Sequence, residues 1–211
     1  MQSPLPGPVL PLSFYLRPTP EVARDLLGAL FVRETAEGRI VGRIVETEAY
    51  HEDDEASHSH RGRTARNAVM FGPPGRLYVY FTYGMHYCMN VVTEEEGVGS
   101  AVLIRAIEPL EGCVLMRGNR LRRSTARVPT PRPNPDRHLG GGPARACAAY
   151  DIDRTANGAS LSGPDLHLCA GAPASPSSPR TIITSTRIGI SRATHLAWRF
   201  HLAGNPCVSH P

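Results

Sequence analysis

The sequence predicts one α/β domain of the α+β kind, in which antiparallel strands and a few helices share a single hydrophobic core. Its 211 residues, 41% of them hydrophobic, are enough for one full core. At least five segments of strand length fall in the first half of the chain. No repeat or linker divides the chain, so we expect one domain over residues 14–211 after a loose, proline-rich arm over residues 1–13.

A helix and a β-hairpin are expected first. The stretch EVARDLLGAL spaces its apolar residues at helical intervals, and Thr19 as N-cap with Pro20 at the first helical position is a start signal. Leu30–Glu34 and Arg39–Tyr50 then predict antiparallel strands joined by a turn at Glu37-Gly38. Because side chains alternate along a strand, the second strand should carry two carboxylates and a phenol on one face. These are Glu46, Glu48 and Tyr50.

A second hairpin follows a polar loop. Residues 51–70 lack strand or helix periodicity, whereas residues 76–82 and 85–92 predict strands about a turn at Tyr83-Gly84. Stacked tyrosines on such strands are as often core as binding surface, but a large aromatic at the turn should be exposed. Together with the acidic face, this hairpin suggests a pocket for a planar ring. Its tyrosines are Tyr78, Tyr80, Tyr83 and Tyr87.

The rest of the chain is expected to return to the sheet. Ala101–Ile107 predicts a buried strand, and residues 112–127 predict a helix. The stretch PARACAAY, with Pro143 at a first helical position, predicts another helix. Further strands are expected over residues 165–169, 181–190 and 196–202.

The net charge of +4 and the pI of about 9.0 are mildly basic, and all 23 basic residues are arginine. Without lysine there is no side-chain amine to form a Schiff base, so attack on a sugar or carbonyl carbon must use water, a carboxylate, a hydroxyl or a thiol. Seven arginines fall between residues 117 and 137 against one acid. They form either a solvated face or a phosphate-binding surface. The candidates for phosphate contacts are Arg117, Arg120, Arg123, Arg127 and Arg145.

The acidic strand next to aromatic residues suggests catalysis by a carboxylate. Alternating glutamates usually form an exposed face, but one that faces a partly enclosed pocket could act as a general base on water. Three histidines and three of the acids in the loop after this strand are possible metal ligands. No second cluster completes a metal site, so we expect no metal. The loop residues are His51, Asp53, Asp54, Glu55, His58 and His60.

Several classes of protein lose support. The chain contains no GxxxxGK[ST] phosphate loop, GxSxG elbow or HExxH motif, and Gly97-Val98-Gly99 lacks the third glycine of a dinucleotide fingerprint. Five widely spaced cysteines form no CxxC pair and predict neither a disulfide framework nor a zinc site. No stretch approaches the length and apolarity of a membrane span, and we expect a cytoplasmic, nucleoid-associated protein.

At the level of motifs, the chain resembles the eukaryotic type of alkyladenine (3-methyladenine, methylpurine) DNA glycosylase, which also occurs in bacteria. The blocks that carry the resemblance are VETEAY, His58-Ser59, Arg66-Asn67, MFGPPGRLYVYFTYGMHYCMN, LIRAIEPLEG and RIGI, within residues 12–208. The resemblance implies a curved antiparallel sheet with surrounding helices and a protruding hairpin. It also implies excision of damaged purines from double-stranded DNA by a monomer without metal or cofactor.

The same resemblance implies roles for particular residues. Glu48 would activate water to attack the sugar C1′, and Arg105 would help to hold that water. Tyr50, Tyr80 and His58 would enclose the flipped base. Asn90 would exclude the 2-amino group of a normal guanine, and Tyr83 would enter the minor groove to fill the gap in the duplex.

Two points remain open to test. A strict two-residue turn at Tyr83-Gly84 would place Asn90 on the face opposite Tyr80, so we predict a longer turn or a bulge. A noncatalytic nucleic-acid-binding module would also explain the charge and the aromatics, but it would be indifferent to mutation of Glu48. A metal-dependent hydrolase would need the loop around His58 and would lose activity with a chelator.

Overall fold

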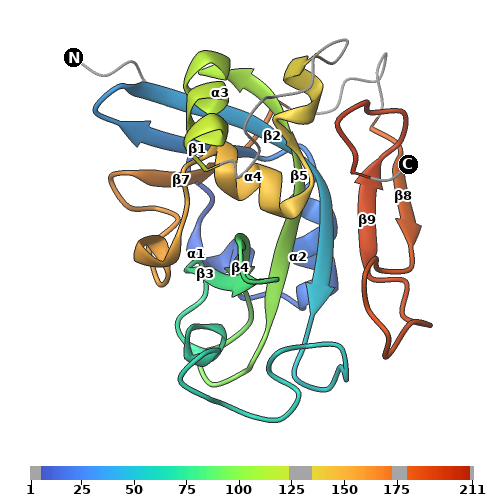
Figure 1. Ribbon diagram of the computed structural model, residues 1–211. Helices are drawn as coiled ribbons and strands as arrows, with labels where there is room; N and C mark the ends of the chain where they lie inside the picture. Colours follow the sequence, from blue (N-terminus) through green and yellow to red (C-terminus); the bar gives the residue numbers. More distant parts are fainter. Residues whose placement is uncertain (1–5, 124–134, 173–179, 210–211) are drawn as a thin grey trace.

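A curved sheet of nine strands, all paired antiparallel, forms the frame of the computed structural model, which describes residues 6–123, 135–172 and 180–209 (Figure 1). The main order of strands is β3-β4-β5-β2-β1-β7, with β6 added to β5, β9 to β2 and β8 to β9. The strands are β1 (Leu30–Thr35), β2 (Gly38–Tyr50), β3 (Leu77–Thr82), β4 (His86–Val92), β5 (Ala101–Glu111), β6 (Gly140–Gly141), β7 (Leu166–Cys169), β8 (Ile182–Ser185) and β9 (Arg199–Leu202). The expected α+β fold with a curved antiparallel sheet is confirmed.

Short helices pack against this sheet. One large cluster of buried apolar side chains joins the sheet to α2 and α4, as expected for a single core. Among the described residues, no helix is long and apolar enough to cross a bilayer. The α-helices are α1 (Leu12–Tyr15), α2 (Thr19–Asp25), α3 (Cys113–Arg122) and α4 (Pro143–Ala149), and the 3₁₀ turns are η1 (Ala68–Phe71), η2 (Pro135–His138) and η3 (Arg154–Ala156).

Strand β2 is an inner strand of the sheet, with neighbours along both edges. It pairs with β5 on one edge. On the other edge it pairs with β1 over residues 38–43 and with β9 over Glu46 to Glu48. Irregular pairing with β5 between Ile44 and Thr47 marks the place where the partner changes. The carboxylate-bearing part of β2 therefore lies inside the sheet and not on a solvated edge.

The β3–β4 hairpin has the register that places its polar and aromatic side chains together. Tyr80 pairs with Cys88 and Thr82 with His86, which leaves a three-residue loop from Tyr83 to Met85. The prediction of a turn longer than two residues is confirmed. Directly paired residues share a face, so Asn90 lies on the same face as its partner Tyr78 and as Tyr80.

Several boundaries differ from the sequence-based expectation. Helix α2 begins at Thr19 with Pro18 as N-cap, because the Thr19 hydroxyl instead bonds with the side chains of Thr93 and Glu94. Strand β5 continues to Glu111. The strand expected over residues 181–190 ends at Ser185, and the segment after it forms a loop. The strand expected from residue 196 begins at Arg199.

The expected loose arm and the expected long helix are described only in part. From Pro8 onward the arm lies against β7, where Val9 pairs with Cys169 and Leu10 donates a hydrogen bond to Leu168. This part of the segment is therefore held in place by the sheet. Helix α3 ends at Arg122, and residues 124–134 lie outside the described residues.

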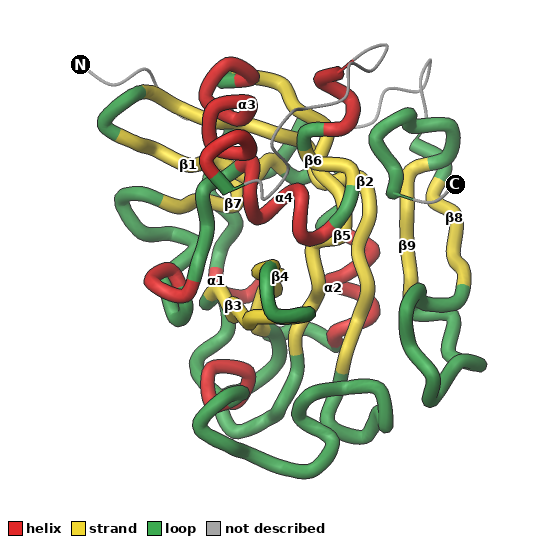
Figure 2. The backbone as a smooth tube through the Cα atoms, viewed as in Figure 1, coloured by secondary structure: helices red, strands yellow, loops and turns green. Residues whose placement is uncertain are grey.

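Long loops gather at one end of the sheet, at the bottom of Figure 2. The loop that follows β2 and the loop that precedes β9 meet there, because Arg187 of the second forms an ion pair with Asp54 of the first. Strand β2 ends here, so Glu48 and Tyr50 lie at this end of the sheet.

Candidate active site

Two carboxylates lie fully buried on one face of β2 and share one guanidinium group. Glu46 and Glu48 are both 0% exposed, and Arg105 from β5 contacts both of them. The alternation argument is thus confirmed for the shared face. The expectation of a solvated polar face, which would be usual for such a pattern, is wrong here. Side chains from β5 and β9, together with the backbone at Ile188 and Ser209, close over the two carboxylates.

Glu48 is held by donors from three separate parts of the chain. Its Oε2 accepts from the Tyr50 hydroxyl at 2.9 Å and from Arg105 Nη1 at 3.2 Å. Its Oε1 accepts from the backbone N–H of Ile188 at 2.7 Å. Burial, and next the Glu48 charge, raise the pKa of Tyr50, so the phenol stays protonated and donates to the carboxylate. These contacts fix the carboxylate of Glu48 in one orientation.

Glu46 has its own set of donors. Its Oε1 accepts from Arg199 Nε at 2.8 Å and from Arg105 Nε at 3.1 Å, and its Oε2 accepts from the backbone N–H of Ser209 at 2.7 Å. Burial opposes its ionisation, but the hydrogen bonds from Ser209 and Arg199 outweigh burial and lower the pKa. Burial likewise opposes the charge on Arg105, but Glu48 and Glu46 outweigh it and raise the pKa.

A cavity of about 390 Å³ opens over this ion cluster. All three groups that hold Glu48 line it, so the carboxylate lies directly behind the cavity wall. The other lining residues come from the β3–β4 hairpin, from Leu103 of β5, from the segments around residues 56–70 and 188–190, and from the start of α4. The sequence-predicted residues Tyr50, His58, Tyr80, Tyr83, Asn90 and Arg105 all line this cavity.

Aromatic rings form one wall of the cavity. The rings of Tyr78 and Tyr80 are stacked, with centroids 5.7 Å apart, and His58 meets the Tyr80 ring edge-on at 4.5 Å. A hydrogen bond of 3.1 Å joins His58 Nδ1 to the Tyr78 hydroxyl. Burial, with a smaller contribution from Arg66, lowers the pKa of His58, so its ring is neutral near pH 7. Neutral flat surfaces of this kind suit a planar and even a cationic guest.

Asn90 and the loop around His58 are fixed by hydrogen bonds. Asn90 Nδ2 donates to the Tyr78 carbonyl at 3.1 Å, and the buried Asn67 donates from Nδ2 to the His58 carbonyl at 2.8 Å. The Ser59 hydroxyl donates to the Gly99 carbonyl at 2.6 Å. This cavity wall is consequently preorganised by buried polar contacts.

Tyr83 stands at the tip of the hairpin. It is 83% exposed and adopts a left-handed backbone conformation with φ of 51°. Met85 in the same loop is 56% exposed and Phe81 below it is 39% exposed. The tip is therefore an apolar projection beside the cavity mouth, as expected for Tyr83.

Sequence reasoning missed three residues that complete the site. Arg187, within the RIGI block, is buried in a bidentate pair with Asp54, and its guanidinium lies 4.6 Å from the centre of the Tyr50 ring. Arg199 and Ser209 anchor Glu46 from β9 and from the end of the described chain. Nothing local marks these positions, since each contact spans more than 130 residues.

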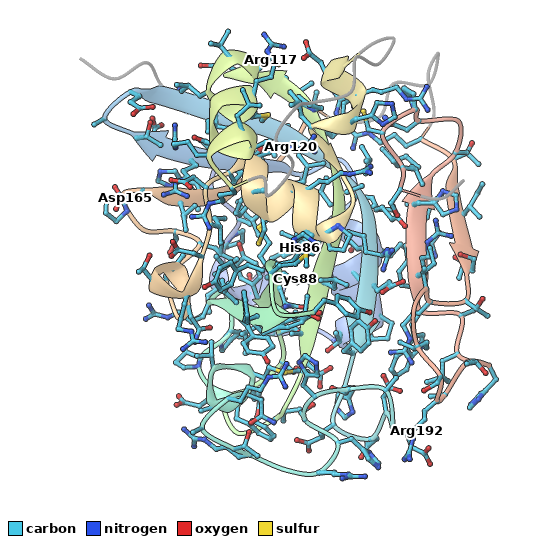
Figure 3. The ribbon with its side chains drawn as sticks, viewed as in Figure 1. His86, Cys88, Arg117, Arg120, Asp165 and Arg192 are labelled. Atoms are coloured by element: carbon cyan, nitrogen blue, oxygen red, sulfur yellow. The ribbon has the colours of Figure 1, made fainter. Side chains whose placement is uncertain are left out.

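The candidate phosphate-binding arginines are held by internal acceptors. Arg117 pairs with Asp136, Arg123 pairs with Asp151 and Asp153, and the carbonyls of His138 and Gly141 accept from Arg120 and Arg145. Arg117 lies at the top of Figure 3, well away from Cys88 in the cavity wall. Arg127 lies outside the described residues. A phosphate contact for this group stays a prediction.

The acidic histidine loop has other structural roles. Asp54 is bound to Arg187, and the His51 imidazole contacts Asp53 and Glu94. Within the described ranges, no group of three or more histidine, cysteine or acidic side chains is arranged to hold a metal ion.

Comparison with known proteins gives a consistent answer. The family model described as "Methylpurine-DNA glycosylase (MPG)" matches residues 13–206. A protein of Chlorobaculum tepidum is 48% identical over 93% of this chain and 88% of its own length. Proteins of Carboxydothermus hydrogenoformans and Methanocella arvoryzae are each 45% identical, over 95% and 96% of this chain and 98% and 96% of their own lengths. All three carry the name "Putative 3-methyladenine DNA glycosylase".

The family match covers nearly the whole chain, and the cavity, the buried carboxylate and the exposed tip tyrosine lie inside it. The chain therefore belongs to the methylpurine-DNA glycosylase family and is a DNA glycosylase, a DNA-binding hydrolase of DNA repair.

Proposed function

We propose that this protein turns a damaged purine out of duplex DNA into the aromatic cavity and hydrolyses its N-glycosidic bond with a water activated by Glu48. The observation that carries the proposal is the position of Glu48, fully buried and held by three groups that all line the cavity. A buried, oriented carboxylate behind a pocket for a flat guest is the arrangement that base removal requires.

The chemical step follows from this arrangement. Water attacks the sugar C1′, the bond from C1′ to the base nitrogen breaks with its electron pair passing to the base, and Glu48 accepts the proton that the water loses. Positive charge develops on the sugar as the base departs, and the negative carboxylate stabilises it. With no lysine in the chain, no side-chain amine can take the place of water. We therefore propose a monofunctional glycosylase with no strand-cleaving lyase step.

Base flipping is supported by the hairpin tip. Extruding a nucleotide costs a few kcal/mol, and the cost is lower for a damaged pair. Tyr83 projects beside the cavity mouth and is free to stack in the space that the base leaves, which offsets part of that cost. Tyr50 and the Tyr80–His58 wall would then hold the extruded base between them.

The substrates proposed are 3-methyladenine, 7-methylguanine, hypoxanthine and ethenoadenine. Alkylated purines carry positive charge, and a cation on an aromatic face gains roughly 0.5 to 2 kcal/mol over a neutral base. The neutral state of His58 avoids repulsion of such a cation. The relatives named for 3-methyladenine support the same class of substrate. Asn90, buried in the cavity wall, would meet the 2-amino group of an undamaged guanine.

We further propose that the protein acts as a monomer and without cofactor, in the cytoplasm and in association with the nucleoid. The internal ion pairs of Arg117 and Arg123 would have to exchange for phosphate if those side chains contact DNA. Arg66 donates to the Phe81 carbonyl, and burial and next the Arg66 charge lower the pKa of His58 in the cavity wall, so Arg66 could contact the DNA backbone beside the cavity without such an exchange.

The test is single-turnover release of hypoxanthine or 7-methylguanine from duplex DNA in EDTA, comparing the native protein with Glu48→Gln. We expect release by the native protein and a loss of about 10²- to 10⁴-fold in the variant, with DNA binding by fluorescence anisotropy retained. Release that survives in Glu48→Gln would refute the role of the carboxylate. Binding without release of either base would favour a noncatalytic binding module, and loss of release in EDTA would favour a metal-dependent hydrolase.

A further inference from the structure

We propose that Glu46, which lies behind the cavity and does not line it, is a positioning residue that sets both the orientation of Arg105 and the proton affinity of Glu48. The inference rests on the proposed function, because it concerns how the proposed base is tuned. It adds to the site a second carboxylate, one that does not line the cavity.

The geometry places Arg105 between the two carboxylates. Its Nε donates to Glu46 Oε1 at 3.1 Å, and its Nη1 donates to Glu48 Oε2 at 3.2 Å. Both distances are at the long end for charge-assisted hydrogen bonds, as expected for a guanidinium shared between two acceptors. The same Glu46 Oε1 also accepts a hydrogen bond from Arg199 Nε at 2.8 Å. Arg199 thus moderates how strongly Glu46 draws Arg105 away from Glu48.

The far side of Glu46 is closed by the end of the described chain. The backbone N–H of Ser209 donates to Oε2 at 2.7 Å, and the Ser209 hydroxyl lies 3.5 Å from Arg105 Nη2. Glu46 therefore cannot rotate toward the cavity without losing two charged donors and an amide. This fixed position is what a residue that orients Arg105 needs.

The charges in this cluster balance, and the balance gives the sign of the effect. Two carboxylates face two guanidinium groups, and all four side chains are buried, so their charges interact strongly. Removing the Glu46 charge leaves Glu48 as the acceptor for Arg105, and this lowers the proton affinity of Glu48. Removing the Arg199 charge lets Glu46 draw Arg105 toward itself, and this raises the proton affinity of Glu48. Other groups that face the cluster are Tyr50 from β2, Cys88 from β4, His201 from β9, and Arg187 from the loop before β9, whose charge is balanced by Asp54.

A different outcome is expected if Glu46 is only structural, that is, if it only neutralises Arg199 and holds β9. Its loss would destabilise the fold and lower activity at every pH by the same factor. A change in the pH at which the rate begins to rise would not follow. The pH profile therefore separates the two roles.

The experiment measures single-turnover base release between pH 5 and 8.5 on duplex DNA carrying 7-methylguanine, or hypoxanthine if only that base is released. For Glu46→Gln we expect the acidic limb of the profile to move about one unit to lower pH, and the plateau rate to fall roughly tenfold because a weaker base accepts the proton. For Arg199→Gln we expect the limb to move to higher pH. Glu46→Asp keeps the charge and should leave the limb in place.

Controls keep the two proposals apart. His201→Asn should leave the limb in place, and a limb that moved with it would belong to His201 and overturn the inference. A lower rate with an unmoved limb in Glu46→Gln, or limbs that move in the same direction in both charge variants, would also overturn it. If Glu46→Gln does not fold, Arg199→Gln carries the test. Glu48→Gln in the same series tests the proposed function alone, since persisting release there refutes it whatever Glu46 does.

Discussion

The buried ion pair between Asp54 and Arg187 offers the sharpest test of how the loops are held over the active site. Both side chains are 0% exposed, and the pair is bidentate, with one of its bonds at 2.9 Å. Arg187 also donates to the Ala49 carbonyl at 2.9 Å. Its guanidinium lies 4.6 Å from the ring centre of Tyr50 and 5.5 Å from that of Trp198. Asp54→Asn removes the countercharge and leaves the rest in place.

The expected cost is large because a guanidinium cannot be neutralised and would stay buried without its partner. Breaking one side of a buried pair costs about 3 to 5 kcal/mol, out of a total stability of about 5 to 15 kcal/mol. For a chain of this size each kcal/mol lowers Tm by about 2 to 4 °C, so a fall of roughly 6 to 20 °C is expected. Replacing both partners by apolar residues, as in Asp54→Leu with Arg187→Met, should recover most of this loss, less about 1 kcal/mol for the bond to Ala49.

Urea unfolding followed by the fluorescence of Trp198, the single tryptophan of the chain, measures the free energy directly beside the pair. A loss below 1 kcal/mol in Asp54→Asn would refute the reasoning, because it would mean that water reaches the guanidinium. A double variant less stable than Asp54→Asn would equally show that the apolar replacement does not fit. Base release should fall in Asp54→Asn as well, since Ile188, next to Arg187, donates to Glu48.

Three further outcomes are expected. Tyr83→Ala should leave the free energy of unfolding within about 0.5 kcal/mol of native, because the side chain is 83% exposed. It should slow base release about tenfold or more relative to Tyr83→Phe. Equal rates in the two variants would show that the hairpin tip takes no part in the mechanism. Gly42→Ala should destabilise by about 1 to 3 kcal/mol in urea, because its Cβ would stand 2.6 Å from the Tyr150 hydroxyl oxygen, and a neutral effect would contradict that close packing. Burial lowers the pKa of His58 and of His201 from 6.5, so the unfolded chain binds more protons than the folded protein. The free energy of unfolding should therefore fall as the pH drops below about 6.5. Urea unfolding between pH 7.5 and 5.5 should show a flatter slope for the double variant His58→Gln with His201→Gln.

Local patterns were sufficient for much of the frame. The alternation in Arg39–Tyr50 predicted a strand with Glu46 and Glu48 on one face, and the turn signals predicted both hairpins. The longer turn was predicted from the resemblance, which places Asn90 and Tyr80 in one pocket, and the register contains it. These features depend on contacts between residues close in sequence, which short-range rules describe well.

The same patterns misjudged boundaries where distant contacts compete with local preference. Thr19 is a good N-cap by type, but its hydroxyl is used by Glu94 and Thr93, and the helix starts one residue earlier than expected. The alternating stretch after residue 181 leaves the sheet at Ser185, because Arg187 turns inward to Asp54. In both places a buried polar bond outweighs a weak local propensity.

By itself the sequence determined the alternation of β2, the exposed tyrosine at a glycine turn, the absence of a side-chain amine and the motifs of the family. Only the tertiary structure decided that Glu46 and Glu48 are buried, because Arg105, Arg199 and two distant backbone segments close over them. Only it brought Ile188 to Glu48 and Ser209 to Glu46, across 140 and 163 residues. A periodic pattern predicts which side chains share a face, but only the tertiary structure determines which groups contact that face.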